Sequence, residues 1–542
     1  MGKEIILSPE QSEASSPAIN VVVQANAGTG KTFVLVRRLL RILFREFQAR
    51  TEGAGKTGAA RPGILCLTYT KAGASEMRNR VLGSVLEWAS ASDGDLRGLL
   101  SGIAHNNPPD DRDLQTARKI FYDFIDNPHL LKIQTVHSFC EDILRRFPIE
   151  AAAPPAWRLV SGAEQKRLLK DAFAELLNRA RPDEEEAFGH IIGLTSEYSL
   201  DALLDSILEQ YRDMILLKQK SNFPDYLVEK TKGFLSLNNP PPKPDFDGDI
   251  DLVLTKTGDI RKKLPPELQK VAPGVYARDQ YEKNMEIMRI SSDFLTLCGG
   301  FADKYAELKN RRGLLDFDDI LYKTMILFSN PETMGQVLSQ LDMSLRHILV
   351  DESQDNSPVM WRIIFSMLDD FFADGDGPNP RSLFMVGDVK QSIFSFQGAS
   401  PSEFASIPEK IRRAAAGGMR QYETVPLLES RRATQAILDV ADYFFNAAGL
   451  PGFPKNVAHK CWRKGDAGLV EINPICSRNA GEELASARKR YIRIIAGKIE
   501  SMAKKENIPQ SDIMVLVQRR DPFVPMLVRE LKRKGIQTAG SD

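Results

Sequence analysis

The segment between residues 25 and 32 constrains the fold of this chain more than any other stretch. It lies between the β-branched run of residues 19–25 and the apolar helical pattern of residues 33–47, and it reads Ala25-Asn26-Ala27-Gly28-Thr29-Gly30-Lys31-Thr32. Phosphate groups are bound by backbone N–H donors, a helix N-terminus and a compact cation. The order strand, glycine-rich loop, Lys-Thr, helix therefore predicts a nucleotide site, with Lys31 on the β- and γ-phosphates and Thr32 on Mg²⁺.

One position departs from the general GxxxxGK[ST] pattern. Ala25 stands where that pattern has its first glycine. A glycine-rich helix start that binds no nucleotide is therefore the alternative interpretation, but the order of the flanking strand and helix favours a phosphate site.

The segments around this loop indicate an α/β fold. A second apolar strand is expected at residues 63–68 and a helix at 72–81, and further strands are expected at 347–350 and 383–386. Strands that are apolar on both faces, with helices between them, are typical of a parallel sheet covered on both sides.

The 542 residues predict roughly three or four domains. Helical periodicity dominates residues 161–312, for example at 164–177 and 200–218, and a proline-rich loop at 238–244 interrupts it. We expect a mainly helical insert here, placed between the two parts of the α/β domain at 1–160 and 313–424.

A second alternation of helix and strand follows from residue 425. The expected helices are at 434–447, 483–504 and 522–534, and the expected strands are at 468–472, 512–517 and 535–538. This alternation predicts the start of a second α/β domain over residues 425–542.

Charge and cysteine content narrow the class of protein. Lys and Arg together number 72, as do Asp and Glu, so the formal net charge is +0. This balance argues against a uniformly basic nucleic-acid coat but permits a local basic groove.

Five scattered cysteines without a CxxC pair indicate reduced thiols and a cytoplasmic protein. No apolar run reaches the roughly 18 residues that span a bilayer, so no membrane association is expected.

Two further strand ends carry residues suited to phosphoryl transfer. The apolar strand 348–350 is followed by Asp351 and Glu352. Asp351 is placed to hold Mg²⁺, directly or through water, and Glu352 to orient and deprotonate the attacking water. Paired acids after a strand also occur as a solvated edge or a helix cap, but together with a phosphate loop they favour hydrolysis. Gln391, after a later strand, is a neutral donor suited to sensing the γ-phosphate.

Two kinds of residue are suited to single-stranded nucleic acid. Phe394 and Phe396 follow the predicted phosphate sensor, where aromatic rings can stack on bases without reading sequence. Elsewhere two aromatic residues at this spacing more often face a core. The polar runs at 68–70 and 135–138 supply hydroxyl and backbone contacts to phosphates.

The motifs in their order resemble those of superfamily 1 DNA helicases, and most of all the AddA subunit of bacterial AddAB helicase–nucleases. In that resemblance Gln11 reads adenine, residues 25–32 form motif I with alanine at its first position, and Arg432 is the arginine of motif IV. The remaining matches are residues 67–72, 135–140, 314–319, 351–355 and 387–399.

The resemblance implies a RecA-like P-loop NTPase motor domain (1A), a 1B-like insert and an incomplete second RecA-like domain (2A). It also implies ATP with Mg²⁺ as cofactors, 3′→5′ movement on single-stranded DNA, unwinding of duplex ends at double-strand breaks, and an AddB-like partner. The DNA contacts that it implies are Thr68, Tyr69, Thr70, Thr135, His137, Ser138, Phe394 and Phe396.

The family continues into motifs V and VI and, in AddA, a nuclease domain, and none of these has a counterpart before Asp542. We therefore expect an N-terminal portion of an AddA-like protein. A nucleotide-binding scaffold that does not hydrolyse ATP and a UvrD-type repair helicase without a nuclease are the alternatives. Gln397 and the segment 137–140 favour AddA over the UvrD type.

Overall fold

The computed structural model describes most of the chain. The described residues are 7–52, 63–104, 108–127, 131–193, 207, 223–255, 257–340, 345–373, 381–393, 399–417, 420–448, 458–478, 482–518, 520 and 522–539. They fall into two compact units, one ending at Asp466 and one beginning at Ala467. No helix in the described part of the chain is long and apolar enough to cross a membrane.

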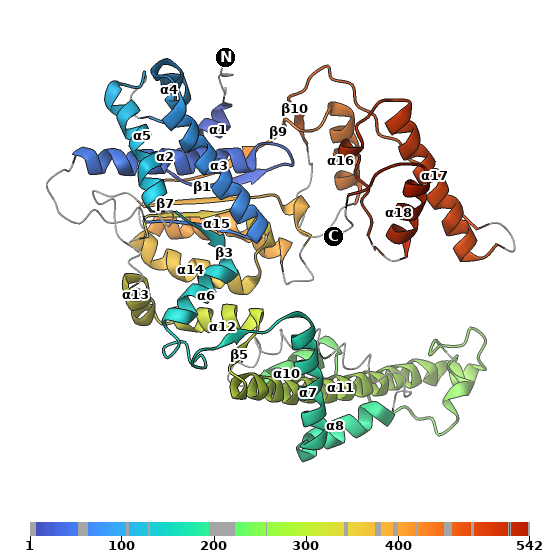
Figure 1. The fold of residues 1–542 in the computed structure, drawn as a ribbon. Helices are drawn as coiled ribbons and strands as arrows, with labels where there is room; N and C mark the ends of the chain where they lie inside the picture. Colours follow the sequence, from blue (N-terminus) through green and yellow to red (C-terminus); the bar gives the residue numbers. More distant parts are fainter. Residues whose placement is uncertain are drawn as a thin grey trace. The chain divides into compact units, whose positions relative to one another are not determined.

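The first unit is built around a sheet of six parallel strands in the order β3-β2-β6-β7-β1-β8 (Figure 1). Its strands are β1 (Asn20–Ala25), β2 (Ile64–Thr68), β3 (Lys132–Thr135), β6 (His347–Val350), β7 (Ser382–Gly387) and β8 (Tyr422–Leu427). Every residue of β2, β6 and β7 is buried, as expected for strands covered on both faces. The predicted α/β fold with a parallel sheet is confirmed.

Helices cover both faces of this sheet (Figure 1). One face packs against α1 (Pro9–Ala14), α2 (Lys31–Glu52), α3 (Lys71–Ser90), α4 (Asp93–Leu100) and α5 (Asp111–Asp126). The other packs against α6 (Val136–Arg146), α12 (Phe317–Phe328), α13 (Pro331–Gln340), α14 (Pro358–Ala373) and α15 (Pro401–Gly417). The apolar stripe of α2 is fully buried, which fixes the helix that follows the predicted phosphate loop.

The described residues between β4 (Arg158–Leu159) and β5 (Leu314–Leu315) are mainly helical, as their periodicity predicts. Its helices are α7 (Gly162–Asn178), α8 (Pro182–Gly193), α10 (Phe223–Phe234) and the 46-residue α11 (Pro266–Arg311). The apolar faces of α7, α8 and α11 share one core. The helix predicted at 200–218 lies outside the described residues, apart from Ile207.

A buried ion cluster ties the end of α11 to the start of α12. Lys309 Nζ lies 2.9 Å from Asp316 Oδ2 and 2.6 Å from Asp319 Oδ2. The side chains of Lys309 and Asp316 are 3% and 0% exposed, and the Tyr305 hydroxyl donates to Asp316 at 2.9 Å. A buried charge is tolerated only when it is paired in this way.

The three helices predicted after residue 425 are confirmed, and the three strands predicted there are wrong. The helices are α16 (Gln435–Ala448), α17 (Leu484–Lys504) and α18 (Phe523–Arg533), and α17 packs on α18 in the second unit. Residues 468–472, 512–517 and 535–538 form no strand. Leu469 and Leu516 there are 82% and 85% exposed. A strand needs a neighbouring ladder, and no described segment of this unit offers one.

The division into compact units does not fall at residue 425. The strand β8 belongs to the first sheet, and β9 (Glu429–Ser430) pairs with β10 (Lys460–Cys461) before the break at Asp466. The assignment of residues to the three expected domains stays a prediction.

Candidate nucleotide site at the carboxyl edge of the sheet

The strand order brings three distant loops together. β1, β7 and β6 are neighbours, and Val23 pairs with Val386 while Val350 pairs with Met385. The carboxyl ends of parallel strands meet at one edge of a sheet, which is where ligands bind in open α/β folds. The loops that begin after Ala25, Val350 and Gly387 therefore converge.

The ammonium group of Lys31 lies at the point of convergence. Its Nζ donates to Glu352 Oε2 at 2.9 Å and to Gln391 Oε1 at 3.4 Å. Gln354 Nε2 donates to the same Glu352 oxygen at 2.8 Å, and Gln391 Nε2 donates to Asp388 Oδ2 at 2.7 Å. Three residues chosen from the sequence for separate steps of phosphoryl transfer thus share one hydrogen-bonded cluster.

The glycine-rich loop is held against the segment that follows β8. Gly28 and Gly30 have φ of +75° and +87°, and the Arg431 N–H donates to the Gly28 carbonyl at 2.9 Å. A Cβ atom on Gly28 would lie 2.6 Å from Arg432 Cβ and 2.8 Å from Ser430 Oγ. Gly28 is therefore required both for its left-handed backbone and for this close approach.

Gly28→Ala is expected to lower the free energy of unfolding by about 1–3 kcal/mol, because it adds left-handed strain and a steric clash. Denaturant unfolding monitored by circular dichroism measures the change. Gly83→Ala in α3 is the matched control, since no atom lies within 4 Å of the added Cβ, and it is expected to stabilise by about 0.5–1 kcal/mol. Equal stability of the two variants would contradict the role given to Gly28.

The acidic pair occupies a strained and partly dehydrated turn. Asp351 is 7% exposed, and its Oδ1 has no hydrogen-bond partner in the described part of the chain. Burial and the neighbouring charge of Glu352 raise the pKa of Asp351 to about 7. Glu352, at the start of the 3₁₀ turn η2 (Ser353–Asp355), has a left-handed φ of 43°. Such strain in a residue other than glycine is concentrated at functional sites.

These residues fit a magnesium ion. The unpartnered Oδ1 of Asp351 is a hard oxygen ligand, and Thr32 adds a hydroxyl in the first turn of α2. The described residues hold no group of three or more His, Cys, Asp or Glu side chains placed to share a metal. Magnesium bound beside a nucleotide needs only one or two protein ligands in addition to phosphates and water.

Gln11 lies beside the phosphate loop. It is 4% exposed, closes a capping box with Ser8 at the start of α1, and donates from Nε2 to the Thr29 carbonyl at 3.1 Å. Its Oε1 accepts from Arg431 Nη2 at 3.4 Å. The side chain proposed to read adenine is thus positioned by both the loop and the arginine segment.

Sequence reasoning missed two cations at this site. Lys390 Nζ donates to Asn26 Oδ1 at 2.5 Å and lies 3.2 Å from Asp388 Oδ1, with its side chain only 9% exposed. Arg431 contacts Gln11, whereas the predicted Arg432 is exposed. Lys390 lies next to Gln391 in the sequence, so a cation beside the predicted phosphate sensor was the signal available.

Six of the eight residues predicted to contact DNA lie at or just after the ends of β2 and β3. Thr68 and Thr135 are register partners, and they are 3% and 5% exposed. Thr70 caps α3, and Thr135 caps α6 by accepting from the Ser138 N–H at 3.1 Å. Their hydroxyl groups thus also serve as helix caps.

The other residues of the predicted DNA contact differ in how far the structure describes them. Tyr69 packs against the core, and the His137 ring meets the Phe317 ring edge-on at 5.4 Å. Phe394 and Phe396 lie outside the described residues.

His137 is expected to make stability depend on pH. Burial lowers its pKa from 6.5 to about 4, so the unfolded chain binds a proton between these values and the folded chain does not. Stability should therefore fall by about 1–2 kcal/mol between roughly pH 7 and pH 5. Denaturant unfolding of the wild type and of His137→Gln at both pH values measures the contribution of His137 to this pH dependence. An unchanged pH dependence in His137→Gln would contradict the assignment.

Comparison with known proteins places this geometry in a family. The profile of the UvrD/REP helicase N-terminal domain matches residues 7–412. An ATP-dependent helicase/nuclease subunit (AddA) from Listeria welshimeri is 24% identical, over 79% of this chain and 38% of its own length. Proteins of the same name from Exiguobacterium sibiricum and Bacillus licheniformis are each 24% identical, over 94% and 95% of this chain and 47% of their own length. The chain thus spans less than half the length of these relatives.

Proposed function

The chain belongs to the UvrD/REP helicase N-terminal domain family, and from this premise we propose that it binds and hydrolyses ATP in order to move along single-stranded DNA. The observation that carries the proposal is the convergence of Lys31, Glu352 and Gln391 at the carboxyl edge of the sheet. Hydrolysis needs a cation on the phosphates, a base for water and a sensor of the γ-phosphate, and these three side chains supply them.

The hydrogen bonds suggest how ATP engages these groups. Lys31 turns from Glu352 to the β- and γ-phosphates, which leaves the Glu352 carboxylate to accept the proton of the attacking water. Gln391 donates to the γ-phosphate. Asp351 and Thr32 hold Mg²⁺, which when bound neutralises charge on the phosphates.

The sheet offers a route from this site to DNA. The Asp351 N–H donates to the Leu67 carbonyl at 2.8 Å, one residue before Thr68, the end of β2. A shift of the acidic turn is therefore passed to the segment predicted to contact DNA phosphates. Contacts to phosphates position a strand without reading its sequence, as a motor requires.

The finer parts of the proposal rest on the motif resemblance and on the names of the relatives. We propose 3′→5′ movement, unwinding of duplex ends in the repair of double-strand breaks by recombination, an AddB-like partner and action in the bacterial cytoplasm. Relatives named as helicase/nuclease subunits support this over a UvrD-type repair helicase.

ATP turnover of the chain with and without single-stranded DNA tests the proposal. Turnover is expected to rise on addition of poly(dT) and to require Mg²⁺. A rate of ATP turnover that does not change on addition of DNA would contradict a motor function. Nucleotide binding without any turnover would instead favour a nucleotide-binding scaffold.

A further inference from the structure

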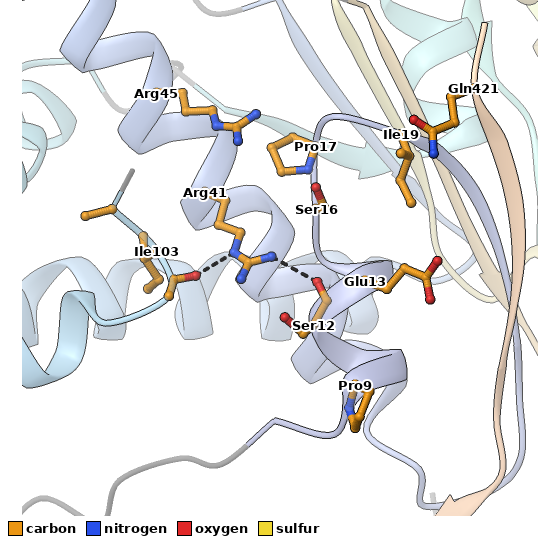
Figure 2. Close-up of a pocket in the computed structure, with 12 residues that line it drawn as sticks. Pro9, Ser12, Glu13, Ser16, Pro17, Ile19, Arg41, Arg45, Ile103 and Gln421 are labelled. Atoms are coloured by element: carbon orange, nitrogen blue, oxygen red, sulfur yellow. Dashed lines mark hydrogen bonds between the residues drawn. The ribbon is translucent and has the colours of Figure 1, made fainter. Parts of the chain in front are cut away.

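A cavity of about 690 Å³ lies at the edge of the sheet opposite to the candidate ATP site. It is formed by α1, α2, the turn at Gly102 and the residues that lead into β1 and β8, which are Ile19 and Gln421 (Figure 2). The volume suits a ligand of nucleotide size. None of the motifs assigned to ATP or DNA accounts for this cavity.

One wall of the cavity is basic, because Arg41 and Arg45 line it. Arg37, which does not line the cavity, lies one turn before Arg41 on the same face of α2. Arg37 donates to the Ser101 carbonyl at 2.8 Å, and Arg41 donates to the Gly102 carbonyl at 2.7 Å. Within the described residues none of the three guanidinium groups pairs with a carboxylate, so their positive charge is uncompensated.

Two of these guanidinium groups keep donors free for a ligand. Arg45 makes no hydrogen bond to any residue that the structure describes, and it lies beside Pro17 at the cavity (Figure 2). Arg41 uses Nε and Nη1 in hydrogen bonds to Gly102, Ser12 and Ser15. Burial, followed by the charges of Arg37 and Arg45, lowers the pKa of Arg41 to about 10. An anion would relieve this repulsion.

The opposite end of the cavity differs in chemistry. Figure 2 shows Glu13 and Gln421 on the far side from Arg41 and Arg45, with Pro17 and Ile19 along the wall between them. A carboxylate and an amide accept hydrogen bonds from ribose hydroxyls or a base amino group. The apolar surface between the two ends suits a sugar or a base.

We propose that this cavity is a second nucleotide site, which binds a nucleoside monophosphate with its phosphate on Arg41 and Arg45. Guanidinium groups bind phosphate through paired, charge-assisted hydrogen bonds. The ribose or base then lies against Pro17 and reaches Glu13 and Gln421. The site goes beyond the proposed motor function and does not depend on it.

The position of the cavity connects it to the candidate ATP site. Arg41 Nη1 donates to the Ser12 carbonyl at 3.1 Å, and Ser12 follows Gln11, whose side chain contacts Thr29 of the phosphate loop. A ligand that engages Arg41 therefore acts on α1, the helix that carries Gln11.

Equilibrium dialysis with radiolabelled AMP tests the proposal. The full chain is first saturated with Mg²⁺ and a non-hydrolysable ATP analogue, so that the phosphate loop is occupied. One further equivalent of AMP is expected to bind. Arg45→Gln should weaken it about tenfold, as the loss of a charge-assisted hydrogen bond implies. Arg289→Gln, an exposed residue of α11, is the control of equal charge and should leave AMP binding unchanged.

Inorganic phosphate and Glu13→Ala test the other end of the cavity. AMP is expected to bind more tightly than phosphate to the wild type, and this preference should shrink in Glu13→Ala, which removes an acceptor. Retained binding of the ATP analogue shows that each variant is folded. The proposal is overturned by the absence of a further AMP equivalent, by unchanged binding in Arg45→Gln, or by equal affinity of the wild type for phosphate and AMP.

Discussion

Glu352→Gln is expected to lower kcat for ATP by about 10²–10⁴ while ATP binding is retained. The carboxylate of Glu352 lies 2.9 Å from Lys31 Nζ. Asp351 and Glu352 follow directly after β6. Glutamine keeps the shape of the side chain but accepts no proton from water. Lys31→Ala, in contrast, removes the cation proposed to bind the phosphates, so both ATP affinity and turnover should be lost.

Steady-state turnover together with binding of a fluorescent ATP analogue separates these effects. Glu423→Gln is the matched control, because it makes the same change at an exposed position of β8. Glu423→Gln should hydrolyse ATP at the wild-type rate. Undiminished turnover in Glu352→Gln would remove this residue from the reaction.

Lys309→Met is expected to lower the free energy of unfolding by about 3–5 kcal/mol, the usual cost of removing one partner from a buried ion pair. The substitution leaves the buried Asp316 and the partly buried Asp319 without their shared cation. Burial and the charge of Asp316 already raise the pKa of Asp319 to about 6 with the lysine present. Chemical denaturation at neutral pH measures the loss.

A surface lysine provides the control for this result. Lys304→Met removes a partly exposed ion pair with Glu307 at 3.6 Å, which should cost about 0–1 kcal/mol. The loss in free energy of unfolding caused by Lys309→Met should also become smaller as the pH falls from about 8 to 5. Carboxyl groups with raised pKa values take up protons in the folded state over this range. A loss in free energy of unfolding that becomes larger as the pH falls would contradict the buried-charge explanation.

The parallel sheet and the phosphate loop could be predicted because their signals are local. The β-branched run before Ala25, the loop and the helix from Lys31 specify one strand–loop–helix unit without reference to the rest of the chain. Asp351 and Glu352 follow an apolar strand in the same way. The roles of these residues stay predictions, although the structure brings Lys31 to Glu352.

What sequence patterns missed depends on non-local geometry. The contact of Lys390 with Asn26 needs β7 beside β1, an adjacency that no local pattern specifies. The choice between Arg431 and Arg432 depends on how the backbone turns where it meets Gly28. The apolar run at 512–517 predicted a strand, but a strand also requires a neighbour to pair with, which a local sequence pattern does not report.

The strand order also governs how this protein is made. β1 pairs with β7 and β8. Asn20 therefore cannot pair with Tyr422 until about 400 further residues have been synthesised. At a synthesis rate of roughly 5–20 residues per second, β1 spends about 20–70 s before even the first of these neighbours, β7, has been made. The unpaired backbone N–H and C=O groups along its edges are open to wrong pairing during that time. The ribosome must therefore complete β8 before the candidate ATP site can close, and chaperone protection of the nascent chain should matter most in this interval.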